Sequence, residues 1–65
     1  MNREFMRLQI LSWSEFIKIS KFSKMCGLNN SAVSNFIKYG SRNLSDKSVY
    51  LLYTTIRDHL RNYFA

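Results

Sequence analysis

The sequence predicts an all-α chain, folded as a compact bundle of four or five helices. The 65 residues contain no proline and only two glycines, Gly27 and Gly40, so little interrupts helix formation. β-Branched residues do not alternate along any segment long enough for a strand. The last third of the chain carries one long apolar stripe with helical spacing. A chain of this length forms a single domain, residues 1–65, with one small core.

The last segment is the clearest predicted helix, over about residues 45–63. Ser45 is a good N-cap, and Asp46 favours the positive end of the helix dipole. Leu44 and Val49 occupy the two positions of a hydrophobic staple. The apolar stripe that follows contains Val49, Leu52, Tyr53, Ile56, Leu60, Tyr63 and Phe64.

A helix is also predicted near the N-terminus, over about residues 3–11. Phe5, Leu8 and Leu11 recur at a spacing of three and therefore share one face. We expect this face to turn toward the core, because a surface helix buries its apolar stripe.

The next segment, "SWSEF", predicts the start of another helix. Ser12 and Glu15 have the spacing of a capping box, which places the first helical residue at Trp13. Gly27 is expected to end this helix as a glycine just beyond its C-cap. Alternatively, Ser20 caps a shorter helix. The apolar face of the segment consists of Phe16, Ile19, Phe22 and Cys26.

The stretch "GLNNSAVSNFIKYG" predicts a short helix between the two glycines. Asn29 is a strong N-cap, and Gly40 ends the helix. Val33, Phe36 and Ile37 form an i, i+3, i+4 set that faces the core. The side chains left pointing outward are Asn30, Ser31, Ser34, Asn35 and Lys38.

The charge balance implies an anionic partner. Ten Lys and Arg against four acids give a net charge of +6, which favours nucleic acid first and a membrane surface second. The single cysteine, Cys26, excludes an internal disulfide and fits a reducing compartment. No apolar run approaches the ~20 residues of a membrane span, and no signal-peptide cleavage site follows one. We therefore expect a cytoplasmic protein without membrane association.

The order helix, glycine turn, short helix is that of a helix-turn-helix, over about residues 19–39. Ser23 occupies the small-residue position where the two helices cross closely, and its hydroxyl needs a carbonyl one turn earlier. Gly27 takes the turn, where positive φ is required. Val33 takes the branched position that fills the gap between the helices.

Residues 20–56 resemble the DNA-binding domain of the lambda repressor and Cro class, the XRE family. The family's Gly-x-Arg loop and the serine that caps its next helix are matched by Gly40, Arg42 and Ser45. The family often opens its first motif helix with Thr-Gln, where this chain has Lys18 and Ile19. The resemblance implies a lambda repressor-like fold and a small sequence-specific transcriptional regulator, a repressor of the phage or plasmid kind.

The resemblance also implies how double-stranded DNA is bound, with a recognition helix at about residues 30–38 in the major groove. Asparagine can pair with adenine, lysine with guanine and serine with either, so we assign base reading to Asn30, Ser31, Ser34, Asn35 and Lys38. We assign phosphate contacts to Lys18, Ser20, Lys21, Lys24, Ser41, Arg42 and Asn43. About five charged contacts imply a salt slope near −4 to −5.

Enzyme chemistry is not expected, because the sequence offers no nucleophile–base pair, paired carboxylates or metal-ligand set. His59 has no catalytic partner placed near it, and Trp13 and Cys26 are expected in the core. We therefore expect no cofactor, no metal and no small-molecule substrate.

Three further hypotheses follow from the sequence. Tyr50 and Leu51 lie off the main stripe of the last helix, as candidate contacts of a homodimer or as cover for the N-terminal helix. A protein-interaction module on the same scaffold is the alternative function, suggested by an apolar surplus at Tyr50, Leu51, Met1 and Met6. A basic amphipathic membrane peptide is the third hypothesis, disfavoured by the glycine turns and serine caps.

Overall fold

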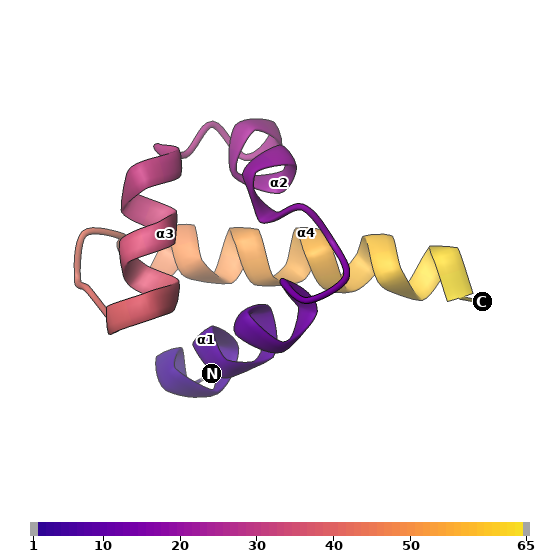
Figure 1. Ribbon diagram of the computed structural model, residues 1–65, viewed down its shortest axis with the longest axis horizontal. Coiled ribbons are helices and arrows are strands. Elements are labelled where there is room, and N and C mark those ends of the chain that lie inside the picture. The colour runs from indigo at the N-terminus through magenta and orange to yellow at the C-terminus, as the bar shows by residue number, and fades with distance from the viewer. Residues whose placement is uncertain (1, 65) are drawn as a thin grey trace.

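The computed structural model describes residues 2–64 and contains four helices within them. These are α1 (Arg3–Trp13), α2 (Ile19–Met25), α3 (Asn30–Tyr39) and α4 (Asp46–Phe64). The long helix α4 is the spine, α1 packs against α3 and α4, and α2 packs against the same two helices (Figure 1). The last turns of α4 extend beyond the other helices (Figure 1). The predicted all-α bundle is thus confirmed, with four helices.

The core lies between the four helices and draws on all of them. The predicted stripe of α4 is buried at Val49, Leu52, Tyr53 and Ile56, and half-buried at Leu60. Tyr63 is exposed, and the side chain of Phe64 lies outside the described part of the chain. The other buried apolar residues are Met6, Ile10, Phe22, Val33, Phe36, Ile37 and Leu44. Each such side chain stabilises the fold by roughly 1.5–3 kcal/mol relative to an exposed one.

Three of the predicted helix ends are confirmed by their capping contacts. The Asn29 side chain accepts a hydrogen bond from the Ala32 backbone N–H at 3.0 Å, so α3 begins where its cap predicts. Gly40 ends α3 in the left-handed region, with φ of 69°. Ser45 Oγ accepts from the Ser48 backbone N–H at 3.1 Å and caps α4.

The predicted helix start at Trp13 is wrong. Trp13 is the last residue of α1, and its ring stacks on Tyr53 of α4 at 5.5 Å between centroids. This contact extends α1 two residues beyond the predicted end, and a turn follows in place of the capping box. In that turn the Ser14 hydroxyl donates to the Leu11 carbonyl, and Phe16 is 60% exposed rather than in the core.

The alternative start of the second helix at Ser20 is also wrong. Helix α2 begins at Ile19, and its N-cap position is held by Lys18 without a side-chain hydrogen bond. The missing cap means that packing, rather than a local sequence signal, sets this boundary.

The predicted apolar face of α1 is wrong as well. Phe5 and Leu8 are each 49% exposed, whereas Met6 and Ile10 are buried. The buried set Met6, Ile10 and Trp13 has helical spacing of its own, and it is the set that meets α4. Met6 is therefore spent on the core and is not part of an apolar surplus, and Met1 lies outside the described residues.

Between residues 2 and 64, none of the helices combines the length and the apolar character needed to cross a membrane.

Candidate nucleic-acid interface

The turn between α2 and α3 is built by Gly27. Its φ is 70°, a conformation that glycine adopts without steric cost. The Gly27 N–H donates to the Lys24 carbonyl at 3.1 Å, and the Leu28 N–H donates to the Ser23 carbonyl at 2.8 Å. These two bonds form a Schellman motif, which satisfies the last carbonyls of α2 and turns the chain toward the start of α3.

Ser23 sits where α2 meets the rest of the bundle, and it is fully buried. Its hydroxyl donates to the Ile19 carbonyl at 3.1 Å, one turn earlier in α2, as predicted. The buried hydroxyl therefore has its partner within the helix. A larger side chain at this position would have no room, because Ser23 is surrounded on all sides.

The five predicted base-reading residues lie on α3, away from its buried Val33, Phe36 and Ile37. Four of them are exposed and Ser34 is half-buried. Their side chains make no hydrogen bond or ion pair with any described residue, so all five can bond to a ligand. They fall into two rows: one of Asn30, Ser34 and Lys38, at intervals of four, and another of Ser31 and Asn35.

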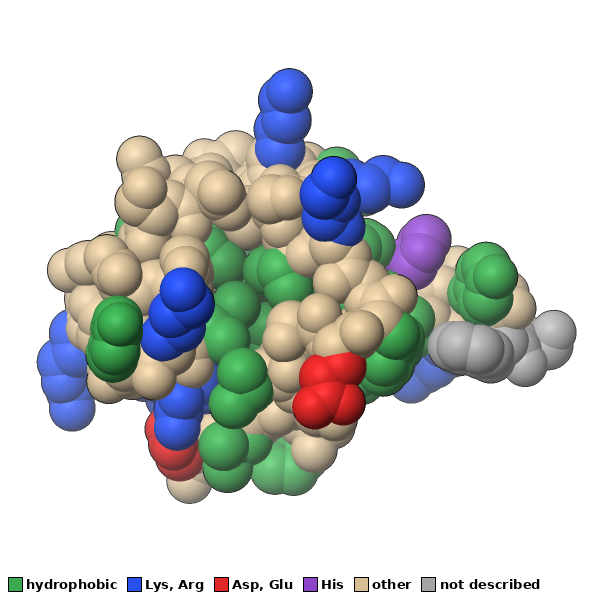
Figure 2. Space-filling model, in the orientation of Figure 1, with side chains coloured by type: hydrophobic (Ala, Val, Ile, Leu, Met, Phe, Trp, Pro, Cys, Tyr) green, Lys and Arg blue, Asp and Glu red, His purple; other side chains and the backbone are tan. Residues whose placement is uncertain are grey.

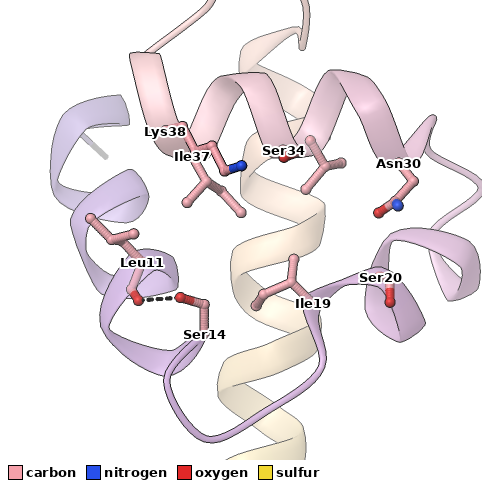
Figure 3. A pocket seen from close by; sticks show the side chains of 9 residues that line it. Leu11, Ser14, Ile19, Ser20, Asn30, Ser34, Ile37 and Lys38 are labelled. Carbon is pink, nitrogen blue, oxygen red and sulfur yellow. Dashed lines mark hydrogen bonds between the residues drawn. The ribbon is translucent and has the colours of Figure 1, made fainter.

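The first row borders a hollow of about 270 Å³ between α1, the start of α2 and α3 (Figure 3). Its interior is apolar and is formed by Leu11, Ile19, Val33 and Ile37, with Ser14 and Ser20 at the edge. Figure 3 shows Ile19 pointing from α2 toward α3, and Asn30 extending from α3 toward Ser20. The row of Ser31 and Asn35 does not line this hollow.

A second hollow adjoins the first, and lysines surround it. It is lined by Lys18, Ser20, Lys21, Lys24, Leu28 and Asn30, of which Ser20 and Asn30 also line the first hollow. All three lysines are exposed and none is paired with a carboxylate of the described chain. Figure 2 shows one face of the molecule, with apolar side chains in a central depression, basic side chains to its left and upper right, and an acidic side chain at its lower right. The structure therefore brings the predicted phosphate contacts of α2 next to Asn30.

The predicted phosphate contacts after α3 lie in the loop that leads to α4. Arg42 and Asn43 are exposed, and Ser41 is half-buried. The Ser41 hydroxyl accepts a hydrogen bond from the Asn43 N–H at 3.2 Å, so it helps to shape the loop. Arg42 lies beside Arg3 and Gly40 at the edge of another hollow, at the opposite end of α3 from the lysines.

Two arginines of α1, Arg3 and Arg7, hold the C-terminal end of α3, a role that the sequence does not predict. Arg7 donates to the Ile37 carbonyl at 2.7 Å and binds both carboxylate oxygens of Glu4, each at 2.7 Å. Its hydrogen bonds to Glu4 lower the pKa of that carboxyl and raise the pKa of the Arg7 guanidinium. The Glu4–Arg7 pair has the i, i+3 spacing of a local helical contact, but the bond to Ile37 joins residues 30 positions apart, so no local pattern predicts it.

Arg3 makes the corresponding contacts one turn earlier. Its guanidinium donates to Asp46 Oδ1 at 2.9 Å and to the Ser41 carbonyl at 3.0 Å, and it lies 4.8 Å from the ring centre of Phe36. Arg3 thereby ties α1, α3 and the start of α4 together. Neither Arg3 nor Arg7 is a free cation, and both act by positioning α3.

Tyr39 is a third residue for which the sequence predicts no role. It ends α3, and 79% of its side chain is exposed. It follows Asn35 by one helical turn, on the side of α3 away from the apolar hollow.

The remaining predicted residues lie elsewhere. Tyr50 and Leu51 are about half exposed on α4, as expected for residues off its main stripe. Cys26 packs against the core, and its thiol lies 3.6 Å from the Thr55 hydroxyl. His59 contacts the ring of Phe22 edge-on at 5.0 Å. Among residues 2–64, no three His, Cys, Asp or Glu side chains come together in a way that could hold a metal ion.

Comparison with protein-family profiles, with curated proteins and with solved structures finds no match to this chain.

Proposed function

We propose that the protein is a small sequence-specific DNA-binding regulator, of the repressor kind, that occupies an operator with α3. One observation carries the proposal. The residues of α3 opposite its buried side offer amide, hydroxyl and amine groups that have no partner in the described chain. These are the groups that pair with base edges in the major groove.

The cations around α3 support the same proposal. The unpaired Lys18, Lys21 and Lys24 lie at its N-terminal end and Arg42 at its C-terminal end. Phosphates flank the major groove on both sides, so cations at both ends of an inserted helix suit a duplex. The net charge of +6 favours association with any nucleic acid.

The experiment that tests the proposal begins with selection of bound duplexes from a random DNA pool. Enrichment of a defined site is expected, and an inverted repeat would indicate that two copies bind together. Asn35→Ala should then weaken binding to the selected site by about 5- to 150-fold, the equivalent of 1–3 kcal/mol for one base contact.

Binding of the Asn35→Ala variant to unrelated DNA should stay nearly unchanged, because Asn35 carries no charge. Asn62→Ala provides a matched control, since Asn62 is an exposed asparagine near the end of α4 and lines neither hollow. An equal loss on selected and unrelated DNA would refute the reading role of Asn35. Absence of any enriched site would refute the proposed function.

A protein-interaction module is the second candidate, and the exposed apolar residues favour it. Phe5 and Leu8 on α1, and Tyr50 and Leu51 on α4, are each about half exposed. An apolar surface of this kind can bind a partner protein or a second copy of the chain. Weak, unenriched DNA binding that vanishes at moderate salt, together with one partner that co-purifies in fixed ratio, would support this candidate.

A further inference from the structure

The apolar hollow beside α3 has a feature that hydrogen bonds from amide and amine side chains to base edges do not explain. Its accessible apolar surface comes mainly from Leu11, which is 40% exposed, and from half-buried Ile19, while Val33 and Ile37 line the hollow but are themselves buried. Its rim, in contrast, is polar, with Ser20 and Asn30 on the side shared with the lysine hollow. This apolar surface is open to solvent and lies between the row of proposed base-reading residues and the proposed phosphate-binding lysines. An apolar group of DNA would suit it.

We propose that this hollow receives the C5-methyl group of a pyrimidine, next to the base that Asn30 reads. The inference rests on the proposed function and deepens it, because it names a chemical group in the operator. Ile19 is the residue that makes the contact, from the first turn of α2. The major-groove edges of the four bases are otherwise polar, and the thymine methyl is their apolar element.

The arrangement suits a nucleotide at the edge of the groove. Lys18 and Lys21 line the lysine hollow, which adjoins the apolar hollow at Ser20 and Asn30, so they suit the phosphate of the nucleotide that carries the methyl. Asn30 and Ser20, shared by both hollows, then stand between the apolar and the charged contact. The hollow is larger than a methyl group. Its remaining space suits the apolar C–H groups of the adjoining deoxyribose.

The source of the methyl group is either thymine or 5-methylcytosine, and the test distinguishes them. Starting from the selected site, each thymine is replaced in turn by uracil, which pairs identically and lacks only the methyl. In a second series, each cytosine is replaced by 5-methylcytosine. Burying one methyl is worth a factor of about four in affinity. We expect one position per half-site to lose about fourfold on demethylation, or to gain about fourfold on methylation.

Ile19→Ala is the variant that links this effect to the hollow. With Ile19→Ala, the ratio of affinities for the methylated and unmethylated duplex should fall to near one. The control is Asn35→Ala, which should weaken binding but leave the ratio unchanged, because Asn35 does not line the hollow. Ile19→Val, which removes a single carbon, provides a second measurement should Ile19→Ala not fold.

The outcomes separate the inference from the proposed function. An enriched site whose affinity depends on no methyl group in either series would overturn the inference and leave the proposed function standing. A methyl effect that persists undiminished in Ile19→Ala would also overturn it, since the contact would lie elsewhere. If no sequence is enriched, the proposed function fails and the inference fails with it.

Discussion

The salt dependence of DNA binding follows from which cations are free. Of the ten Lys and Arg, three are paired with carboxylates within residues 2–64: Arg3 with Asp46, Arg7 with Glu4 and Arg57 with Asp58. Two more, Lys47 and Arg61, lie on α4 and line neither hollow beside α3. The five that remain, around α3, are Lys18, Lys21, Lys24, Lys38 and Arg42.

Four of these cations are assigned to phosphates and Lys38 to a base, but every charge brought to the duplex releases counterions. Five charges at about −0.9 each give a slope of log affinity against log salt of about −4.5. Between 50 and 200 mM salt, affinity should therefore fall by about 500-fold. Fluorescence anisotropy with a labelled duplex, repeated at five or six salt concentrations, measures this slope directly.

Single substitutions test whether the correct cations have been identified. Lys21→Ala should reduce the magnitude of the slope by about 0.9 on selected and unrelated DNA alike. Arg61→Ala removes the same charge from the far end of α4 and should leave the slope unchanged. A wild-type slope weaker than about −2, or equal effects of the two substitutions, would refute the assignment of these phosphate contacts.

Three other changes test the fold that holds α3, each by urea or thermal unfolding. Ser23→Ala should change the free energy of unfolding by less than about 0.5 kcal/mol. Ser23→Val should lower it by about 1–3 kcal/mol, because the larger side chain overpacks the site. Equal effects of the two substitutions would contradict the close packing. Gly27→Ala should cost about 1–2 kcal/mol from its φ of 70° alone, since no atom lies within 4 Å of the added carbon, and a neutral result would refute that. The pKa of Glu4 lies below its ordinary value because of Arg7, so the Glu4 carboxylate stabilises the fold above about pH 4.5 and loses this effect as pH falls through the lowered pKa. Glu4→Gln should therefore lower the melting temperature at pH 7, and this difference should shrink as the pH is lowered below about 4.5; a pH-independent difference would contradict the ion pair.

The helices near α3 could be predicted from the sequence because their signals are local. Asn29 caps α3 and Ser45 caps α4 through bonds to backbone N–H groups three residues away. Gly27 and Gly40 both adopt positive φ. Such contacts depend on residue type and short spacing, which a sequence displays directly.

The N-terminal third could not be predicted correctly because its structure depends on distant contacts. Ser12 and Glu15 have the spacing of a capping box, yet Trp13 stacks on Tyr53, forty positions later in the sequence, and is the last residue of α1. The choice between the Phe5 face and the Met6 face of α1 is likewise decided by α4. Tertiary packing overrides a local signal when both alternatives are helical.

The candidate site could be predicted as a set of residues, but its shape could not. All five outward side chains of α3 follow from the helical period and its buried set. Which of the two rows borders the apolar hollow depends on where α1 and α2 approach α3, and this places the hollow beside Asn30 but not beside Asn35. Arg3 and Arg7, which hold α3, act through the carbonyls of Ser41 and Ile37 and therefore leave no sequence signature.

Folding and the proposed recognition depend on different side chains of α3, so they can be tested separately. The energy that holds α3 comes from Val33, Phe36 and Ile37 on its buried side, while its polar side chains bond to nothing in the described chain. Substitutions at Ser31 or Asn35 should therefore change stability by no more than about 0.5 kcal/mol. Because the fold places no packing demand on these positions, substitutions there test the proposed base reading without disturbing the core. A stable variant that loses site-specific binding would locate recognition on α3, whereas loss of stability at Asn35 would reveal a structural role that the geometry does not provide.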